Sequence, residues 1–195
     1  GRDVFRRFAN LDELEPVFGL GMMGQIFTSS DADQNDLVTG QTSFANTTPT
    51  FLLRVPTGIT AIPVFLDLSQ AGTVAGADIE VYAEFDLIER YSAGGTSEKI
   101  ASNRTTGGQT AACTFFTNPT AVAGYGMNHW RAKIAPDISP AEGIIPGPAI
   151  IPIAPIFIVG PGAWLIYTLA GTTGATWLWA ASWIEVNTAS LPNAR

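Results

Sequence analysis

The residue types that most often carry catalysis are scarce in this chain of 195 residues. His129 is its one histidine and Cys113 its one cysteine. A Ser–His–Asp or Cys–His site needs the histidine within hydrogen-bond reach of its nucleophile, and no motif or spacing ties His129 to Cys113 or to a serine. One histidine and one cysteine also cannot fill a structural zinc site. The sequence therefore predicts a protein that is not an enzyme and uses no cofactor, with Cys113 as a small buried hydrophobe.

One short acidic segment is similar to part of a cation site. Asp31, Asp33 and Asn35 alternate as in the first half of a calcium-binding loop, and alternate oxygen ligands suit a hard cation. However, Asp36 stands where such a loop needs glycine, and Thr42 stands where it needs glutamate. A solvated acidic turn is the simpler interpretation, and calcium bound at a junction between subunits stays open as the alternative.

Three tryptophans near the carboxyl end form another candidate site. Trp177, Trp179 and Trp183 are separated by even numbers of residues, so they share one face of a strand. Aromatic rings on one face can stack on successive sugar rings, which makes a carbohydrate-binding β-sandwich the alternative function. The other face of this strand is also mainly apolar, and such a strand is more simply buried on both sides. We expect one side in the core and the other under an arm or a neighbouring copy, so the three tryptophans are candidate interface residues.

The carboxyl-terminal part of the chain contains a long stretch without charge. No charged residue occurs between Glu142 and Glu185, and prolines recur through residues 146–161. A membrane-spanning helix needs about 20 apolar residues whose amides are all satisfied within the helix, which these prolines prevent. The stretch therefore predicts extended segments that are buried in a core or against other copies.

The overall composition favours burial against other copies in the same way. Charged residues make up 14% of the chain, against a usual share of roughly 25%, while 46% of the residues are hydrophobic. The net charge of −7 argues against strong nucleic-acid binding by the main domain, because phosphate contacts depend on clustered lysine and arginine. Composition thus indicates an assembly subunit rather than a nucleic-acid-binding protein.

Residues 25–195 show a β pattern throughout. The clearest alternation lies in residues 77–91, where Ile79 and Val81 share one face while Glu80 and Glu84 share the other, which we expect to meet solvent or a polar neighbour. The number of strands and their irregular spacing predict an all-β antiparallel β-sandwich or jelly roll. The expected strands are residues 51–55, 59–68 (with Pro63 at an edge or bulge), 77–91, 99–104, 111–117, 127–134, 150–159, 163–170 and 176–186.

Residues 1–24 differ from the rest of the chain. Phe5, Phe8 and Leu11 recur at helical spacing and predict a short amphipathic helix that ends at Pro16. Its arginines lie near its start and its acidic residues near its end, which opposes the helix dipole, so the helix needs a partner surface. We interpret the segment as an arm whose apolar residues form an interface; a helix packed across its own domain is the alternative.

This organisation resembles the single jelly-roll capsid proteins of icosahedral viruses, including bacterial ones. The resemblance covers the architecture: the amphipathic arm, the low-charge β domain and the apolar strands broken by proline and glycine. It implies a virion structural protein, either a capsid or a capsid-decorating subunit, that self-assembles into an icosahedral shell. The implied partners are copies of itself and other virion proteins, with an internal membrane or inner layer as a further one, because the acidic body repels nucleic acid.

Overall fold

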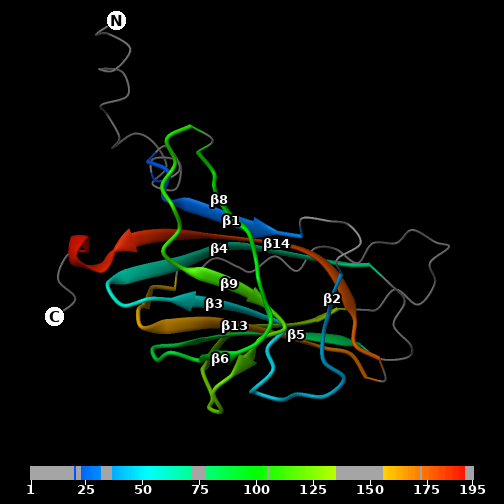
Figure 1. Ribbon diagram of the computed structural model, residues 1–195. Helices are drawn as coiled ribbons and strands as arrows, with labels where there is room; N and C mark the ends of the chain where they lie inside the picture. Colours follow the sequence, from blue (N-terminus) through cyan, green and yellow to red (C-terminus); the bar gives the residue numbers. More distant parts are fainter. Residues whose placement is uncertain are drawn as a thin grey trace, which may run out of the picture.

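The computed structural model is built from antiparallel β-sheets that lie one above the other (Figure 1). Two sheets have six strands each, and a third has two. This arrangement confirms the all-β prediction for the part of the chain that the structure describes. The described residues are 20, 23–31, 37–71, 78–104, 106–134, 156–171 and 173–191.

The first sheet is organised around its longest carboxyl-terminal strand. This strand, β14, pairs with β1 on one side and with β4 on the other, and β2 also pairs with it. The outermost positions are taken by β12, next to β4, and by β8, next to β1. The bounds are β1 (Ile26–Ser30), β2 (Val38–Thr39), β4 (Ile59–Gln70), β8 (Ile100–Ser102), β12 (Ile158–Val159) and β14 (Thr176–Asn187).

The second sheet is organised in the same way around β13. This strand pairs with β3 on one side and with β5 on the other, and the order continues to β11 at one edge and through β9 to β7 at the other. The short strands β6 and β10 pair separately. The bounds are β3 (Phe51–Val55), β5 (Ile79–Asp86), β6 (Tyr91–Ala93), β7 (Thr96–Ser97), β9 (Thr114–Thr117), β10 (Thr120–Ala121), β11 (Met127–Ile134) and β13 (Gly162–Leu169), and a 3-10 turn (Thr188–Ser190) follows β14.

The main hydrophobic core lies where the inner faces of the two sheets meet. β5 shows how the sequence produces this core: Ile79, Val81 and Ala83 alternate with polar residues and are fully buried. Alternation with period two places such residues on one face of a strand. The polar face of β5 is covered only in part, because the Glu84 side chain is buried while the Glu80 side chain stays 25% exposed.

A second, smaller core covers the outer face of the second sheet. Residues 162–168 of β13 are all buried, which requires cover on both faces of the strand. The outer cover includes Tyr91 and Ala121 of the two-stranded sheet and the segment around Phe44 and Asn46. The Tyr167 hydroxyl donates a hydrogen bond to the Asn46 carbonyl at 3.1 Å, and its ring lies 5.1 Å from that of Phe44. Part of the charge-free stretch is therefore buried within its own chain.

One sequence detail agrees with the described strands. Pro63 lies at a register shift between β4 and β14, which confirms the predicted bulge. No helix in the described ranges is long and apolar enough to cross a membrane. The predicted helix with Phe5 and Phe8, and the residues 135–155 that precede β12, lie outside the described residues.

Candidate functional site

The three tryptophans of β14 face the core between the sheets. Trp177, Trp179 and Trp183 share a face as predicted, and the most exposed of them, Trp179, keeps only 5% of its surface. A sugar platform and a contact between copies both need exposed rings. The hypothesis that these residues form either surface is therefore wrong for this structure, because the second sheet already covers them.

Each of these indole rings is fixed by a specific partner. The Phe115 ring stacks on Trp179 at 5.1 Å and on Trp183 at 5.8 Å between ring centroids. The Trp177 indole N–H donates to the Thr168 hydroxyl at 3.0 Å. Buried aromatic residues with satisfied polar groups are major contributors to core stability, so the strand acts as the hydrophobic centre of the sandwich.

His129 also has a structural role. It is the extra residue at a register shift of β11, and its Nε2 accepts a hydrogen bond from the indole N–H of buried Trp164 at 3.0 Å. This contact requires a neutral imidazole with its proton on Nδ1. Burial lowers the pKa of His129 and so favours this neutral form. The prediction that His129 and Cys113 form no catalytic pair remains a prediction.

Cys113 is buried, as the sequence predicts, beside a buried carboxylate. The Glu185 carboxylate accepts hydrogen bonds from the amides of Ala112 (2.7 Å) and Cys113 (3.1 Å) and from the indole N–H of Trp183 (2.8 Å). Burial and the nearby Glu185 charge raise the pKa of the Cys113 thiol. A thiol that stays protonated is a poor nucleophile and metal ligand. Cys113 and Glu185 are therefore interpreted as structural residues of the core.

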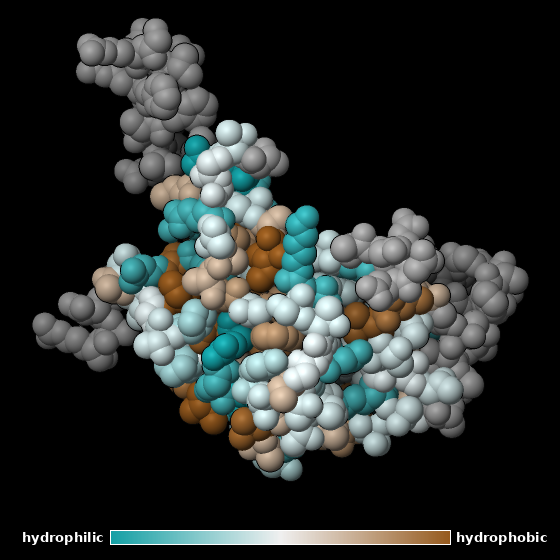
Figure 2. Space-filling model, in the orientation of Figure 1, coloured by the Kyte–Doolittle hydropathy of each residue, from teal (hydrophilic) through white to brown (hydrophobic). Residues whose placement is uncertain are grey.

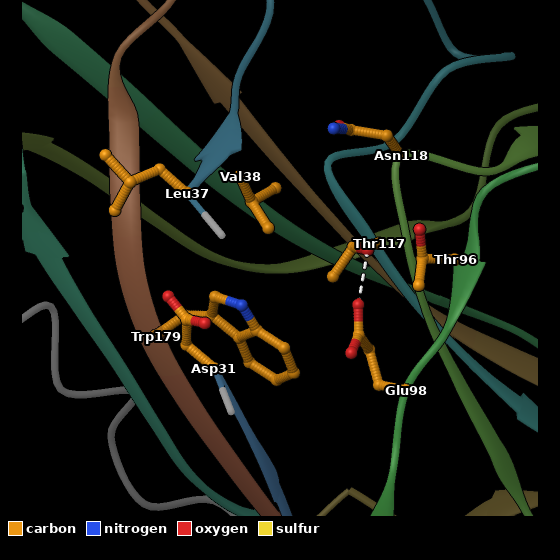
Figure 3. A pocket seen from close by; sticks show the side chains of 8 residues that line it. All are labelled: Asp31, Leu37, Val38, Thr96, Glu98, Thr117, Asn118 and Trp179. Carbon is orange, nitrogen blue, oxygen red and sulfur yellow. Dashed lines mark hydrogen bonds between the residues drawn. The ribbon is translucent and has the colours of Figure 1, made fainter. Parts of the chain in front are cut away.

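A polar cavity opens at one end of the sandwich, between the two sheets, and is the clearest candidate site. Its volume is about 250 Å³. Figure 3 shows side chains from both sheets reaching into it. The lining residues are Asp31, Leu37, Val38, Thr96, Glu98, Thr117, Asn118 and Trp179.

The first wall of this cavity is set by β14. The amide of Asp31 donates to the carbonyl of Trp179 at 3.1 Å, which extends the pairing of β1 with β14 by one residue. Val38 of β2 pairs with Trp177 on the same side of β14. These two ladders bring the Asp31 carboxylate, an aliphatic surface and one part of the Trp179 indole together.

The opposite wall is set by β7 and β9. Thr96 pairs with Thr117, and the next segment is held by a hydrogen bond from the Glu98 amide to the Phe115 carbonyl at 2.9 Å. The Thr117 hydroxyl donates to the Glu98 carboxylate at 2.6 Å. Asn118 follows with a positive φ of 46°, a conformation that asparagine adopts more readily than most residues. Asn118 thus ends β9 at the border of the cavity.

The arrangement offers negative charge, hydrogen bonds and an aromatic wall. Asp31 and Glu98 approach the space from opposite sides, and in the view of Figure 3 the Trp179 indole lies between them. None of the described lining residues is basic. No group of three or more histidine, cysteine, aspartate or glutamate residues in the described ranges is placed to hold a metal. Asp33 and Asn35, the other members of the predicted calcium motif, lie outside those ranges.

A second surface feature is an apolar end of the molecule. Leu87 and Ile88 follow β5, while Tyr125 precedes Met127 at the start of β11, which pairs with the end of β5. These four side chains, here called the apolar tip, are 57–81% exposed. Figure 2 shows hydrophobic side chains on the surface at the lower left, where β5 and β6 lie in Figure 1.

The apolar tip is held together by one buried arginine. Arg90 is fully buried and forms an ion pair with Asp86 at 2.8 Å. Its guanidinium also donates to the carbonyls of Val122 and Gly124, each at 2.9 Å. Because a planar guanidinium with several fixed donors restrains all its acceptors, the two loops that carry the tip keep one relative position.

Sequence reasoning identified some members of these sites and missed others. The acidic pattern pointed to Asp31, but nothing near Glu98 or Arg90 in the sequence indicated a role. The apolar spacing around Leu87 predicted a continuing strand, whereas the strand ends at Asp86. Phe5, Phe8 and Leu11, the predicted interface of the arm, lie outside the described residues.

Comparison of the chain with protein-family models, with curated proteins and with solved structures found no match.

Proposed function

We propose that the protein is a non-enzymatic, self-assembling jelly-roll subunit of a virion shell, either as a capsid protein or as a protein that decorates the capsid. The observation that carries the proposal is the order in which the strands pair. A jelly roll has eight strands in two sheets, and it forms when a long antiparallel hairpin is rolled up. The first strand then pairs with the eighth, the second with the seventh, the third with the sixth, and the fourth with the fifth.

Eight strands of this chain support that scheme. In chain order they are β1, β3, β4, β5, β11, β12, β13 and β14. The observed ladders join β1 with β14, β3 with β13, β4 with β12, and β5 with β11. The remaining strands β6 to β10 then form one insertion between the fourth and fifth strands, and β2 lies in the connection between the first and second.

The apolar tip supports assembly as the function carried by this fold. Soluble proteins that expose contiguous apolar surface commonly use it to bind a partner. Arg90 fixes the loops of the tip before any partner binds, and preorganised surfaces lose less conformational entropy on binding. The low content of charged residues, 14%, supports the same conclusion, because charged side chains are depleted from the centres of interfaces.

The proposal is tested with the purified full chain by light scattering and native mass measurement over a wide concentration range. We expect large closed particles in equilibrium with smaller species. Exchange of Leu87 and Met127 for glutamate should leave the circular dichroism and thermal unfolding of the subunit intact while it prevents particle formation. The control is Gln109→Glu, which adds a charge to an exposed loop outside the tip.

Two results would count against the proposal in different ways. A chain that stays monomeric at every concentration overturns self-assembly as the function. Particles that form normally with the glutamate variants overturn the apolar tip as the contact.

A further inference from the structure

We propose that the buried carboxyl group of Glu84 is a proton-sensitive switch for the apolar tip, so that mild acid favours assembly of the subunit and a higher pH weakens it. This inference deepens the proposed assembly function and rests on it. It adds control by pH to a contact that the exposed apolar side chains alone would make at any pH.

Glu84 lies directly against the loop that carries half of the tip. Its carboxylate accepts a hydrogen bond from the backbone amide of Gly126, which stands between Tyr125 and Met127 of the tip. A Cβ atom at position 126 would lie 2.8 Å from the Phe85 carbonyl oxygen and 3.2 Å from the Glu84 Cβ. The loop backbone therefore packs closely on this part of β5, and a change at the Glu84 carboxyl acts on the tip directly.

The Glu84 carboxyl group is buried with an incomplete set of partners. The residue keeps only 7% of its surface exposed, and its Oε2 is buried without a hydrogen bond from the described residues. An ionised carboxylate that is removed from water without full compensation costs much more free energy than a neutral carboxyl group in the same place. Protonation of Glu84 therefore lowers the cost of keeping the loop packed.

The charged groups closest to Glu84 contain more acid than base. Arg90 is fully buried and pairs with Asp86 at 2.8 Å, and the Arg90 charge favours ionised Glu84 while the Asp86 charge opposes it. Tyr167 of β13 faces the same cluster, and burial raises the pKa of its hydroxyl, which stays neutral. One guanidinium and two carboxylates carry a net charge of −1, so a single proton on Glu84 makes the buried cluster neutral.

The strands on either side of Glu84 direct their charges elsewhere. On β13 the residue paired with Glu84 is Leu165, and on β11 it is Asn128. Arg131 and Lys133 of β11 form ion pairs with Glu80, farther along β5. The protonation state of Glu84 thus depends mainly on its burial and on the balance between Arg90 and Asp86.

The direction of the switch follows from burial. Burial raises the pKa of Glu84 above 4.5, so the packed loop is most stable when the group is protonated and loses this stability as pH rises through the folded value. Ionised Glu84 favours separation of the Gly126 end of the loop from β5, because water then reaches the carboxylate. A less ordered tip loses more conformational entropy when it binds another copy, so assembly weakens.

The first experiment measures assembly of the full chain by light scattering at pH 5 and pH 8. The concentration that wild type needs for assembly should rise at least about fivefold, the low end of typical coupling between two sites. Glu84→Gln is neutral at both pH values and keeps an acceptor for the Gly126 amide, so it should lose most of this dependence. At pH 8 it should assemble at about the concentration that wild type needs at pH 5.

The matched control for Glu84→Gln is Asp78→Asn. Asp78 is exposed and precedes β5 at the end away from the tip, so the variant removes the same charge without touching the cluster. It should keep the pH dependence of wild type. His129 and the other titrating groups are present in both variants, so the difference between the two isolates Glu84.

A second experiment observes the loop in the unassembled subunit. Deuterium exchange is measured on the wild-type chain below its assembly concentration, with each rate corrected for the intrinsic effect of pH on amide exchange. Protection of the amides in residues 122–127 should fall between pH 5 and pH 8, while protection of residues 163–168 in β13 stays constant. This measurement needs no variant, so it holds even if Glu84→Gln fails to fold.

The two experiments separate failure of the inference from failure of the proposed function. Constant protection of residues 122–127 in wild type overturns the inference, and so does an equal pH dependence of assembly in Glu84→Gln and Asp78→Asn. If wild type forms no particles at any pH, the proposed function is overturned instead, and the exchange measurement still decides whether Glu84 controls the loop.

Discussion

The buried Glu185 is the residue on which several core contacts depend. Its carboxylate accepts three hydrogen bonds, two from amides in the Ala112–Cys113 segment and one from the indole of Trp183. Removing an acceptor leaves buried donors unsatisfied, which costs about 1–3 kcal/mol each. We expect Glu185→Gln to lower the free energy of unfolding by about 1–3 kcal/mol, measured by urea titration.

The matched control for Glu185→Gln is Glu89→Gln. Glu89 forms an exposed ion pair with Arg54, and such pairs contribute about 0–1 kcal/mol. If both variants lose the same small amount of stability, the Glu185 hydrogen bonds have no special role in the core.

Glu84 gives the fold a dependence on pH. Its Oε2 is buried and accepts no hydrogen bond from the described residues. Burial raises its pKa above the usual 4.5, against the opposing effects of a Gly126 backbone hydrogen bond and the Arg90 charge. A carboxyl with a raised pKa stabilises the fold fully below its unfolded value of 4.5, and this contribution is lost as pH rises through the folded value.

Glu84→Gln should therefore stabilise the protein at pH 7 and lose this advantage below about pH 4. The measurement is the thermal midpoint of wild type and variant across that range. Equal midpoints at every pH would show that the Glu84 charge does not oppose folding.

His129 should make the fold less stable in mild acid. Burial lowers its pKa from the usual 6.5, and its Nε2 must stay unprotonated to accept from Trp164. The unfolded chain takes up a proton as pH falls below 6.5, whereas the folded chain resists until its own lower pKa is reached, so stability declines between these two values. We expect His129→Gln to reduce this decline, as measured by urea unfolding at pH 7 and pH 5. A decline of the same size in the variant would assign it to other groups.

At the scale of elements, β14 is predicted to be the least tolerant strand. Trp179→Asp places a carboxylate in the aromatic cluster with Phe115, and the loss of the buried ring alone costs about 3–5 kcal/mol. We expect the variant to lose cooperative thermal unfolding. The control is Tyr125→Asp in the apolar tip, which should unfold like wild type but fail to assemble. A folded Trp179→Asp subunit would mean that this face of β14 is not part of the core.

The strands differ in how far the sequence predicts them. Residues 51–55 and 127–134 were predicted to the residue, because each is a sufficiently long run with strand-forming side chains between clear turns. The two-residue strands β2 and β10 were not predicted, because two residues show no periodicity. The even spacing of Trp177 and Trp179 predicted their common face, but which layer covers that face depends on strands that are distant in sequence.

The cavity shows the same limit for functional sites. Asp31 belongs to a recognisable acidic pattern, but it lines the same cavity as Glu98 only because β1 pairs with β14 and β7 pairs with β9. Local patterns of residue types in the sequence do not show which distant strands pair with one another. The apolar tip was missed for a related reason, since Leu87 continues the alternation of β5 after the strand has ended.

At the scale of the whole molecule, the amino-terminal segment should be dispensable for folding. The Leu20 carbonyl accepts from the Gln25 amide, and the Gly24 carbonyl accepts from the Ser102 hydroxyl, so a deletion of residues 1–19 leaves these contacts in place. We expect the shortened chain to unfold at the same temperature as wild type and to assemble poorly. If the deletion instead abolishes cooperative unfolding, the segment is part of the folded core.

The central positions of β13 and β14 determine when the chain can fold during its synthesis. Each of these strands lies between partners that are made earlier, β3 and β5 for one and β1 and β4 for the other. Until β13 and β14 have left the ribosome, neither sheet is continuous and the edges of the earlier strands are open. Ribosomes add about 5–20 residues per second. Native structure therefore depends on pairings of long sequence separation, which form slowly. A nascent chain that waits in this state is open to association with other nascent chains, so subunit assembly and misassembly begin from the same exposed edges.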